Sequence, residues 1–306
     1  MITFAFCTFN RGERLEALVA AMRAQQADVA FEILAVNNNS SDHTLAELER
    51  LAALPGAPLR FVTETAQGIV PARNRALAEA INSDIMVFID DDELPCPGLL
   101  AAAHHAITVE GAQCAGGRVE VDFTPYRRPA WLRDELLGFL AEVDHGTRPF
   151  WITSEETPVW TANVAYDMRV FRDDPSLRFD RRYNREGSAL GGGEDVMMFR
   201  SFLARGLRIR YRPDMHVRHF VESWRLKRRY FLKLHYGAGI RYARNDSSEF
   251  RNQLFGVPPF VFMQALSLCR KALWRCLRAD PGWLRHSMTA THALGQIRGY
   301  RQRSRS

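Results

Sequence analysis

The chain of 306 residues is long enough for one large domain or a domain with an appendage, and its 46% hydrophobic residues predict a sizeable core. Five cysteines without a CxxC pair argue against a disulfide framework and a zinc site, and suit a reducing cytoplasm. Residues 1–221 carry 24 Lys and Arg against 31 Asp and Glu, a net charge of −7, whereas residues 222–306 carry 17 against 4, a net charge of +13. We therefore expect an acidic domain followed by a basic extension. Met1 leads straight into strand-like sequence, so no signal peptide is expected.

Apolar runs alternate with amphipathic segments over the first 121 residues. The apolar runs are Thr3–Phe9, Phe31–Val36, Leu59–Val62, Ile85–Ile89 and Gln113–Val121. The amphipathic segments between them are Arg14–Gln25, Thr44–Ala53, Val70–Ile81 and Pro97–Val109. Strands that alternate with helices predict βαβ units, and hence an α/β fold with a mostly parallel sheet flanked by helices.

The alternation stops between Asp122 and Pro158, where prolines and aromatic residues predict an irregular insertion over the sheet. Regular structure is predicted to resume with the segment Val159–Tyr166, a helix over about Glu194–Arg205 and a strand over Leu207–Tyr211. After residue 221 the chain is predicted to be helical, with breaks at 256–259 and 280–282 where glycine and proline cluster.

Four consecutive carboxylates, Asp90 to Glu93, directly follow the predicted strand Ile85–Ile89. In open α/β sheets, ligands bind at the carboxyl ends of the strands. Adjacent like charges raise each other's pKa unless a cation compensates them. Mg²⁺ and Mn²⁺ prefer oxygen ligands, and Mg²⁺ commonly uses one or two carboxylates together with substrate phosphates. The run predicts a metal and phosphate site; solvated acids at a capped strand end are the alternative.

Four other polar segments lie at the ends of predicted elements. They are Cys7-Thr8-Phe9-Asn10-Arg11, Val36-Asn37-Asn38-Asn39-Ser40-Ser41-Asp42, Gln67-Gly68-Ile69-Val70-Pro71-Ala72-Arg73-Asn74 and Gly191-Gly192-Gly193-Glu194-Asp195. Together with the acidic run, and in this order and spacing, they resemble the family-2 glycosyltransferases over about residues 1–220. These are inverting nucleotide-sugar enzymes of the GT-A (Rossmann-like) fold. The resemblance implies a catalytic domain over 1–221, with a nucleotide-sugar half at about 1–121 and an acceptor half at about 122–221.

The resemblance implies that the first two strand ends bind the nucleotide. Thr8, Phe9 and Arg11 would border the base and ribose, although Arg11 also suits the first turn of a helix. Asn37 stands where the family commonly has an aspartate that accepts a hydrogen bond from the uracil ring. Its amide oxygen can still accept, so UDP is favoured, with dTDP and GDP left open.

The resemblance also assigns the cation. Asp92 would be the metal ligand, Asp91 would lie near the ribose, and Asp90 would support the metal. Arg73 would lie near the nucleotide, with a surface helical arginine as the alternative. His219, expected to follow the strand and Pro213, would lie near the metal or diphosphate, with a structural histidine as the alternative. The implied cofactor is Mn²⁺ or Mg²⁺.

The Gly191–Asp195 segment carries the predicted catalytic residues. Glycines let the backbone approach a ligand closely, so Gly193 would border the donor, and acids suit the start of a helix. By the resemblance, Asp195 is the general base and Glu194 positions the acceptor; favourable first-turn acids are the alternative. Trp160 and Asn163 would border the sugar and acceptor, with a core tryptophan as the equal alternative.

The basic extension contains a helical pattern over residues 260–278 with one polar stripe, made of Gln264, Ser267, Lys271, Arg275 and Arg278. Its apolar run Leu254–Cys269 is shorter than the ~20 residues that span a bilayer. A wide apolar face beside basic residues predicts a helix that lies on an anionic membrane surface. A helix packed on the catalytic domain is the alternative. Nucleic-acid binding is not expected, because no known module accompanies the charge.

The resemblance, together with the basic extension, implies a cytoplasmic, metal-dependent inverting glycosyltransferase that is peripherally associated with the inner face of the cell membrane. It would transfer a sugar from a nucleoside diphosphate, with UDP favoured, to a lipid-linked or saccharide acceptor in cell-surface polysaccharide or glycolipid biosynthesis. A sugar-nucleotide nucleotidyltransferase is one alternative, but such enzymes carry a Gly-rich basic loop where this chain has Thr8–Gly12 with a single glycine. A non-catalytic membrane-bound assembly protein is the other, and the retained acidic motifs argue against it.

Overall fold

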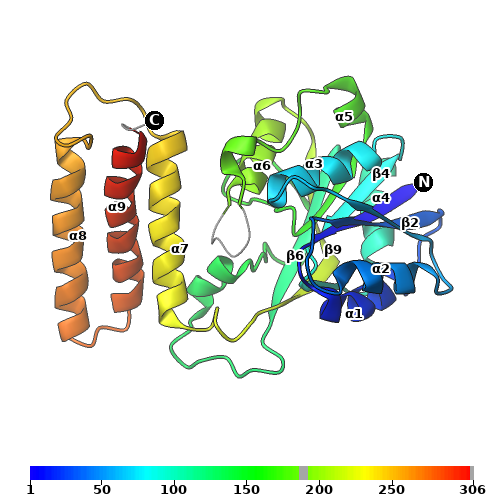
Figure 1. The fold of residues 1–306 in the computed structure, drawn as a ribbon, viewed down its shortest axis with the longest axis horizontal. Coiled ribbons are helices and arrows are strands. Elements are labelled where there is room, and N and C mark those ends of the chain that lie inside the picture. The colour runs from blue at the N-terminus through cyan, green and yellow to red at the C-terminus, as the bar shows by residue number, and fades with distance from the viewer. Residues whose placement is uncertain (186–191, 304–306) are drawn as a thin grey trace. The chain divides into compact units, whose positions relative to one another are not determined.

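The computed structural model describes residues 1–185 and 192–303. The described residues form two compact units, which are treated separately. Unit 1 comprises residues 1–185 and 192–221, and unit 2 comprises residues 222–303. Figure 1 shows unit 1 as a sheet flanked by helices and unit 2 as a group of long helices.

Unit 1 contains nine strands in one sheet. They are β1 (Ile2–Thr8), β2 (Phe31–Asn37), β3 (Leu59–Thr63), β4 (Ile85–Ile89), β5 (Glu93–Pro95), β6 (Cys114–Asp122), β7 (Phe150–Ile152), β8 (Asn163–Asp167) and β9 (Ile209–Phe220). The helices of unit 1 are α1 (Gly12–Arg23), α2 (Thr44–Ala52), α3 (Ile69–Glu79), α4 (Leu99–Thr108), α5 (Arg169–Asp173) and α6 (Glu194–Ala204), with 3-10 turns η1 (Asp134–Leu140) and η2 (Arg181–Tyr183).

The strands follow the order β3-β2-β1-β4-β8-β6-β9-β5, with β7 paired to β9. Strands β3, β2, β1 and β4 are parallel, and β6 and β9 run in the same direction, whereas β8, β5 and β7 are antiparallel to their neighbours. Helices α1 and α2 lie on one side of the parallel strands and α3 on the other (Figure 1), as right-handed βαβ crossovers require. The predicted α/β fold with a mostly parallel sheet is confirmed.

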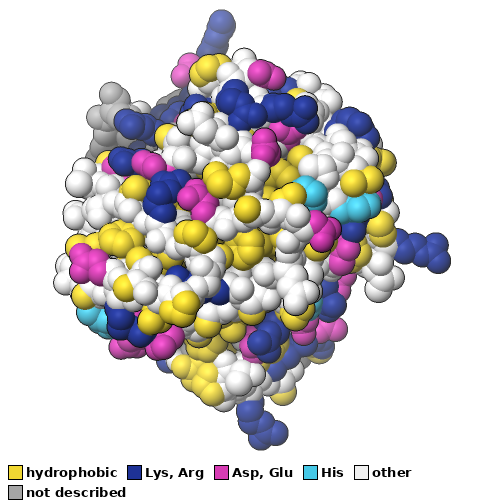
Figure 2. Space-filling model, turned by 90° about the vertical axis from the view of Figure 1, so that its right-hand side faces the viewer, with side chains coloured by type: hydrophobic (Ala, Val, Ile, Leu, Met, Phe, Trp, Pro, Cys, Tyr) yellow, Lys and Arg dark blue, Asp and Glu magenta, His cyan; other side chains and the backbone are white. Residues whose placement is uncertain are grey.

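The core of unit 1 explains why its central strands are continuous apolar runs. Helices cover both faces of the parallel strands, so every residue of β4 is buried, and Phe4, Phe6 and Phe88 are fully enclosed. Burying a side chain of this size contributes about 1.5–3 kcal/mol. Figure 2 shows a face of the molecule on which acidic and basic side chains are interspersed. Apolar packing therefore stabilises the interior of the sheet, which leaves charged side chains for its edges.

The nine elements predicted before residue 122 are all present, with bounds within two residues of those expected. The predicted strand Leu207–Tyr211 is wrong in length, because β9 continues through Pro213 to Phe220. The register between β6 and β9 shifts at Gly117/Arg118, and this bulge accommodates a proline that cannot donate to the ladder. His219 consequently lies within β9 and does not follow the strand as predicted.

Unit 2 consists of α7 (Arg228–Arg241), the π-helical turn η3 (Tyr242–Asp246), α8 (Pro259–Leu277) and α9 (Trp283–Arg303). The helical extension is confirmed. The break before α8 covers residues 247–258 and is longer than the predicted 256–259, whereas the break between α8 and α9 contains the predicted 280–282. Helices α7 and α9 cross at glycines: a Cβ on Gly239 would lie 2.0 Å from the His292 carbonyl oxygen, and one on Gly295 would lie 2.1 Å from that of Tyr236. Only glycine permits so close an approach. None of the described helices is long and apolar enough to cross a membrane.

Candidate active site

The carboxyl ends of the adjacent strands β2, β1 and β4 lie at one edge of the unit 1 sheet. Thr8 and Asn37 end their strands in register with one another, and Asp90 directly follows β4. This edge is where open α/β sheets bind ligands. The structure therefore brings the predicted nucleotide loop residues and the acidic run to the same edge.

The loops after β1 and β2 are held together by side chains. The Asn10 backbone has a positive φ of 53°, and its Oδ1 accepts a hydrogen bond from the Ser41 N–H at 2.8 Å. The Arg11 N–H donates to Thr44 Oγ1 at 3.0 Å, which fixes the start of α1 against the start of α2. Phe9 and Arg11 remain partly exposed beside this junction, whereas Thr8 is buried. The loops thus form a preformed wall of the site.

Asn37 is buried, and its Oδ1 accepts a hydrogen bond from the Ser40 N–H at 3.1 Å. This bond closes the turn after β2, so the amide oxygen already has a partner within the loop. Contact between Asn37 and a nucleobase stays a prediction.

The neighbouring Asn38 is a site-building residue that the sequence did not single out. Its Oδ1 accepts from the Gly68 N–H at 2.7 Å, and its Nδ2 donates to the Ala66 carbonyl at 2.7 Å. Asn38 therefore ties the β2 loop to the start of α3, the helix that carries Arg73. A run of three asparagines was the only signal, and it does not distinguish the member that turns inward.

Arg73 connects the two acidic motifs. Its guanidinium donates to Glu194 Oε1 at 2.8 Å through Nη1 and to Asp90 Oδ1 at 3.0 Å through Nη2, and its side chain is only 4% exposed. Burial opposes the charge, yet the carboxylates of Asp90 and Glu194 raise the pKa of Arg73. Residues far apart in the sequence are thereby joined in one ion-pair network. The surface-arginine alternative is wrong.

Glu194 is engaged on both carboxylate oxygens. Oε1 pairs with Arg73, and Oε2 accepts a hydrogen bond from the Gly193 N–H at 2.9 Å. Gly193 has a φ of 133°, which an L side chain rarely adopts, and a Cβ there would lie 2.9 Å from the Tyr183 ring. Glu194 thus anchors the first turn of α6, and its predicted contact with an acceptor stays a prediction. Gly191 lies outside the described residues.

Asp195 follows Glu194 in the first turn of α6 and stays partly exposed. Withdrawal from water, together with the Glu194 charge, raises the pKa of Asp195 to about 6, while Arg73 opposes that rise. Its Oδ1 accepts a hydrogen bond from the Val196 N–H at 2.8 Å, which orients the carboxylate. A carboxylate with a pKa just below neutral is suited to accept a proton at physiological pH.

The acidic run concentrates negative charge next to β9. Burial and the neighbouring Asp92 raise the pKa of Asp91 to about 7. Asp92 Oδ1 lies 3.5 Å from His219 Nδ1, so the predicted metal residues Asp92 and His219 are brought together. Among the described residues no group of three or more His, Cys, Asp and Glu is arranged to hold a metal ion. Adjacent carboxylates in a set this small fit a divalent cation that takes its remaining ligands from substrate phosphates.

Glu93, the last member of the acidic run, is the second residue to which the sequence assigned no role of its own. Its carboxylate is fully buried, and Oε2 accepts a hydrogen bond from the Asp90 N–H at 2.8 Å. Glu93 pairs with His219 across β5 and β9, with Oε1 3.5 Å from His219 Nδ1. Burial and the charges of Asp90 and Asp92 raise the pKa of Glu93 well above its usual range. Glu93 closes the turn that presents the aspartates.

Asn163 is the first residue of β8 and pairs with Ile89 at the end of β4, and Trp160 lies just before the strand. The Asn163 side chain turns into the sheet, where Nδ2 donates to the Arg118 carbonyl at 3.0 Å and the Met215 carbonyl at 2.7 Å. This residue braces the bulge between β6 and β9, and its burial does not support the predicted sugar contact. Trp160 packs edge-on against Phe199 and is partly exposed.

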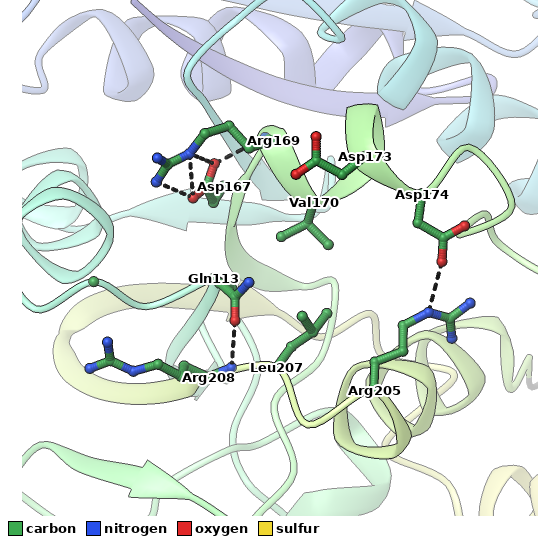
Figure 3. A pocket seen from close by; sticks show the side chains of 10 residues that line it. Gln113, Asp167, Arg169, Val170, Asp173, Asp174, Arg205, Leu207 and Arg208 are labelled. Carbon is green, nitrogen blue, oxygen red and sulfur yellow. Dashed lines mark hydrogen bonds and ion pairs between the residues drawn. The ribbon is translucent and has the colours of Figure 1, made fainter.

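A cavity of about 610 Å³ lies elsewhere, at the amino edge of the sheet (Figure 3). Asp167, which lines the cavity, pairs with the first residue of β4. The acidic run follows the last residue of the same strand, at its opposite end. The charged lining of the cavity is largely paired internally: Arg169 with Asp167 at 2.7 Å, and Arg205 with Asp174 at 2.9 Å. The cavity contains none of the predicted site residues.

Comparison with known proteins gives a consistent result. A family model described as glycosyl transferase family 2 matches residues 3–174. The uncharacterized glycosyltransferase YfnE of Bacillus subtilis (strain 168) is 36% identical over 94 residues, which are 30% of this chain and only 23% of that protein.

Solved structures resemble nearly the whole chain. A mannosyltransferase, PcManGT from Pyrobaculum calidifontis, in complex with GDP-Man and Mn²⁺, has a TM-score of 0.58 at 16% identity, covering 97% of this chain and 86% of that one. TarS residues 1–349 from S. aureus, in complex with UDP-GlcNAc, has a TM-score of 0.57 at 15% identity, covering 98% and 91%. At such identities the likeness shows the fold, and it confirms the GT-A prediction.

Proposed function

The chain belongs to glycosyl transferase family 2, and from this premise we propose that it transfers a sugar from a nucleoside diphosphate to an acceptor hydroxyl with inversion. The observation that carries the proposal is the Arg73 network, which joins Asp90 of the acidic run to Glu194 beside Asp195. The acids that we propose to bind the donor and the proposed base are thereby linked through one network.

In the proposed reaction Asp195 acts as the general base. The acceptor hydroxyl gives its proton to the Asp195 carboxylate while its oxygen bonds to the anomeric carbon. The bond between that carbon and the diphosphate oxygen breaks, and the nucleoside diphosphate leaves with the electron pair. A pKa of about 6 keeps Asp195 ionised at neutral pH yet basic enough to accept the proton. One displacement of this kind inverts the configuration at the anomeric carbon.

The other charged residues of the site bind and position. Asp92, with His219 beside it, would hold a Mn²⁺ or Mg²⁺ ion. When bound, such an ion neutralises the charge that develops on the departing diphosphate. Asp91 would contact the ribose, and Asp90 would orient the metal-binding turn through Arg73 and Glu93. The Mn²⁺ in a structurally similar mannosyltransferase supports this assignment.

We propose UDP as the nucleotide of the donor. Thr8, Phe9 and Arg11 line the loop that would receive the base and ribose, and Asn37 would use its remaining acceptor capacity toward the base. A structurally similar protein binds UDP-GlcNAc and another binds GDP-Man, so both donors belong in a first test. A lipid-linked or saccharide intermediate of cell-surface polysaccharide or glycolipid synthesis is the proposed acceptor. The enzyme would work in the cytoplasm at the inner face of the cell membrane, to which the net charge of +13 of residues 222–306 would attract it.

Nucleotide release from a panel of UDP-, GDP- and dTDP-sugars, with Mn²⁺, with Mg²⁺ and with a chelator, tests the proposal. We expect release of the nucleoside diphosphate from at least one donor, and only with a divalent cation present. Formation of a sugar nucleotide from a sugar 1-phosphate and a nucleoside triphosphate would identify a nucleotidyltransferase instead. Absence of release from every donor, by protein that still binds nucleotide, would favour a non-catalytic role.

A further inference from the structure

Helix α8 of unit 2 is packed with its small side chains inward. Val261, Ala265 and Ala272 are buried, and Val261 joins a cluster with Tyr300 of α9. Six large apolar side chains of the helix are exposed instead, with exposed fractions of 50–78%, whereas Phe262 packs partly buried against that cluster. The six are Phe260, Met263, Leu266, Leu273, Trp274 and Leu277. A helix that only had to cover α9 would bury these residues, so the arrangement indicates a second apolar partner.

Basic residues accompany the exposed apolar side chains. At about 100° per residue, Lys271 and Arg278 lie along one side of the apolar strip, and Arg270 lies within it. The Arg278 guanidinium lies 3.9 Å from the centre of the Trp274 ring, so the cation rests on the aromatic face. Residues 259–277 contain no Asp or Glu. The outer face of α8 is therefore apolar and cationic together.

We propose that the outer face of α8 docks on an anionic lipid bilayer, lying in the interface parallel to its plane. This names the surface that would produce the membrane association proposed above, and it does not depend on the catalytic proposal. The apolar strip would enter the acyl boundary while Lys271 and Arg278 reach the phosphate groups. Since none of the described helices can span a bilayer, the contact would be peripheral.

The charge pattern favours a bilayer over a second copy of the chain. A symmetric dimer through this face would bring Arg270 and Lys271 of both copies together with no carboxylate on either α8 to offset them. An anionic bilayer offers apolar and negative chemistry on one surface. Nucleic acid would pair with the cations but would leave Met263, Leu266 and Leu277 exposed to water.

Flotation of the full chain with vesicles tests the proposal. The vesicles are phosphatidylcholine alone or an equimolar mixture with phosphatidylglycerol, at low and high salt. Three proteins are compared: the native chain, the triple variant Met263→Gln, Leu266→Gln, Leu277→Gln, and a matched triple of exposed apolar residues in unit 1, Leu45→Gln, Leu54→Gln, Val109→Gln. We expect the α8 triple to bind mixed vesicles at least about tenfold more weakly than the native chain, and the unit 1 triple to bind within about twofold of it.

We expect the native chain to prefer the mixed vesicles and to retain part of its binding at high salt, because screening weakens the charge term but not the apolar one. Equal binding by both triples would overturn the proposal, as would absence of binding by the native chain. A native dimer that becomes monomeric in the α8 triple on size-exclusion chromatography would assign the face to self-association. Donor hydrolysis, measured on the same samples without lipid, keeps failure here distinct from failure of the catalytic proposal.

Discussion

The carboxyl edge of the unit 1 sheet and the outer face of α8 depart from the ordinary distribution of side chains in opposite ways. At the sheet edge, charged groups such as Arg73, Glu93 and Glu194 are buried. On α8, large apolar groups such as Met263 and Leu277 are exposed. Buried charge and exposed apolar surface are each unfavourable alone, so both regions are informative about partners. We propose that the first is organised for a charged small ligand and the second for an apolar, anionic surface.

The largest effect is expected at the sheet edge, when Asp195 is replaced. Asp195→Asn keeps the shape of the side chain but removes the base, so kcat should fall by about 10²–10⁴-fold while donor affinity persists. Initial rates and donor titration measure the two quantities separately. An unchanged kcat would show that Asp195 is not the general base and that another residue accepts the proton.

Arg73 should have the next largest effect. Arg73→Met leaves Asp90 and Glu194 without their shared partner, and breaking a buried ion pair in this way costs about 3–5 kcal/mol of unfolding free energy. Arg75→Met on the same helix is the matched control: Arg75 is 40% exposed and pairs with Glu79, so its loss should cost about 1 kcal/mol or less. Urea unfolding of both variants makes the comparison. Equal costs would show that the Arg73 network does not hold the site together.

Asp92→Asn tests the charge that the site presents to a cation. An amide cannot supply the negative charge that a hard divalent ion prefers, so the Mn²⁺-dependent part of donor affinity should weaken at least about tenfold. Asp134→Asn, at a carboxylate that is 88% exposed, is the control and should bind as the native protein does. Calorimetric titration of donor with and without Mn²⁺ reports the difference. An unchanged Mn²⁺ dependence would reassign the metal to Asp90 or Asp91, or remove it from this edge.

The raised pKa of Asp195 predicts a pH profile. Below about pH 6 the carboxyl is protonated and cannot accept a proton, so kcat should fall about tenfold per pH unit there and level off above it. The residual rate of Asp195→Asn should lack this limb. A native profile without an acidic limb near pH 6 would contradict the assignment.

The smallest effect is expected on donor hydrolysis when the outer face of α8 is changed, because we expect the two regions to act independently. The Met263→Gln, Leu266→Gln, Leu277→Gln variant should hydrolyse donor in solution within about twofold of the native rate, because none of these residues belongs to the catalytic machinery. A large loss without lipid would show that the outer face of α8 also supports the site.

The pattern of apolar and polar residues predicted those strands and helices whose residues follow local sequence rules. Ile85–Ile89 was predicted to the residue because a buried parallel strand is a continuous apolar run that ends where charge begins. The helical extension was predicted, and its break at 280–282 lies between α8 and α9, but the end of η3 at Asp246 was not predicted because no glycine or proline marks it. The family followed from ordered motifs at strand ends, and the family model confirms it.

Features that depend on contacts between distant residues were not predictable in the same way. The extension of β9 past Pro213 requires a bulge opposite Gly117, which no local rule announces. Asn38, in a run of three asparagines, and Asn163, in a segment predicted to be regular, are turned inward by tertiary hydrogen bonds that no local pattern indicates. The outward side of α8 depends on which of its faces meets α9. The contact of Asp90 and Glu194 with one shared arginine became evident only from the position of Arg73 in the structure.

The configuration of the product tests the central claim most directly. With water as acceptor and an α-configured donor identified in the nucleotide panel, proton NMR in the first minutes distinguishes the α and β anomers of the released sugar. A single displacement assisted by Asp195 predicts that the β anomer forms first and later equilibrates. Initial formation of the α anomer would contradict the account, because retention requires a second displacement or a different mechanism at this edge.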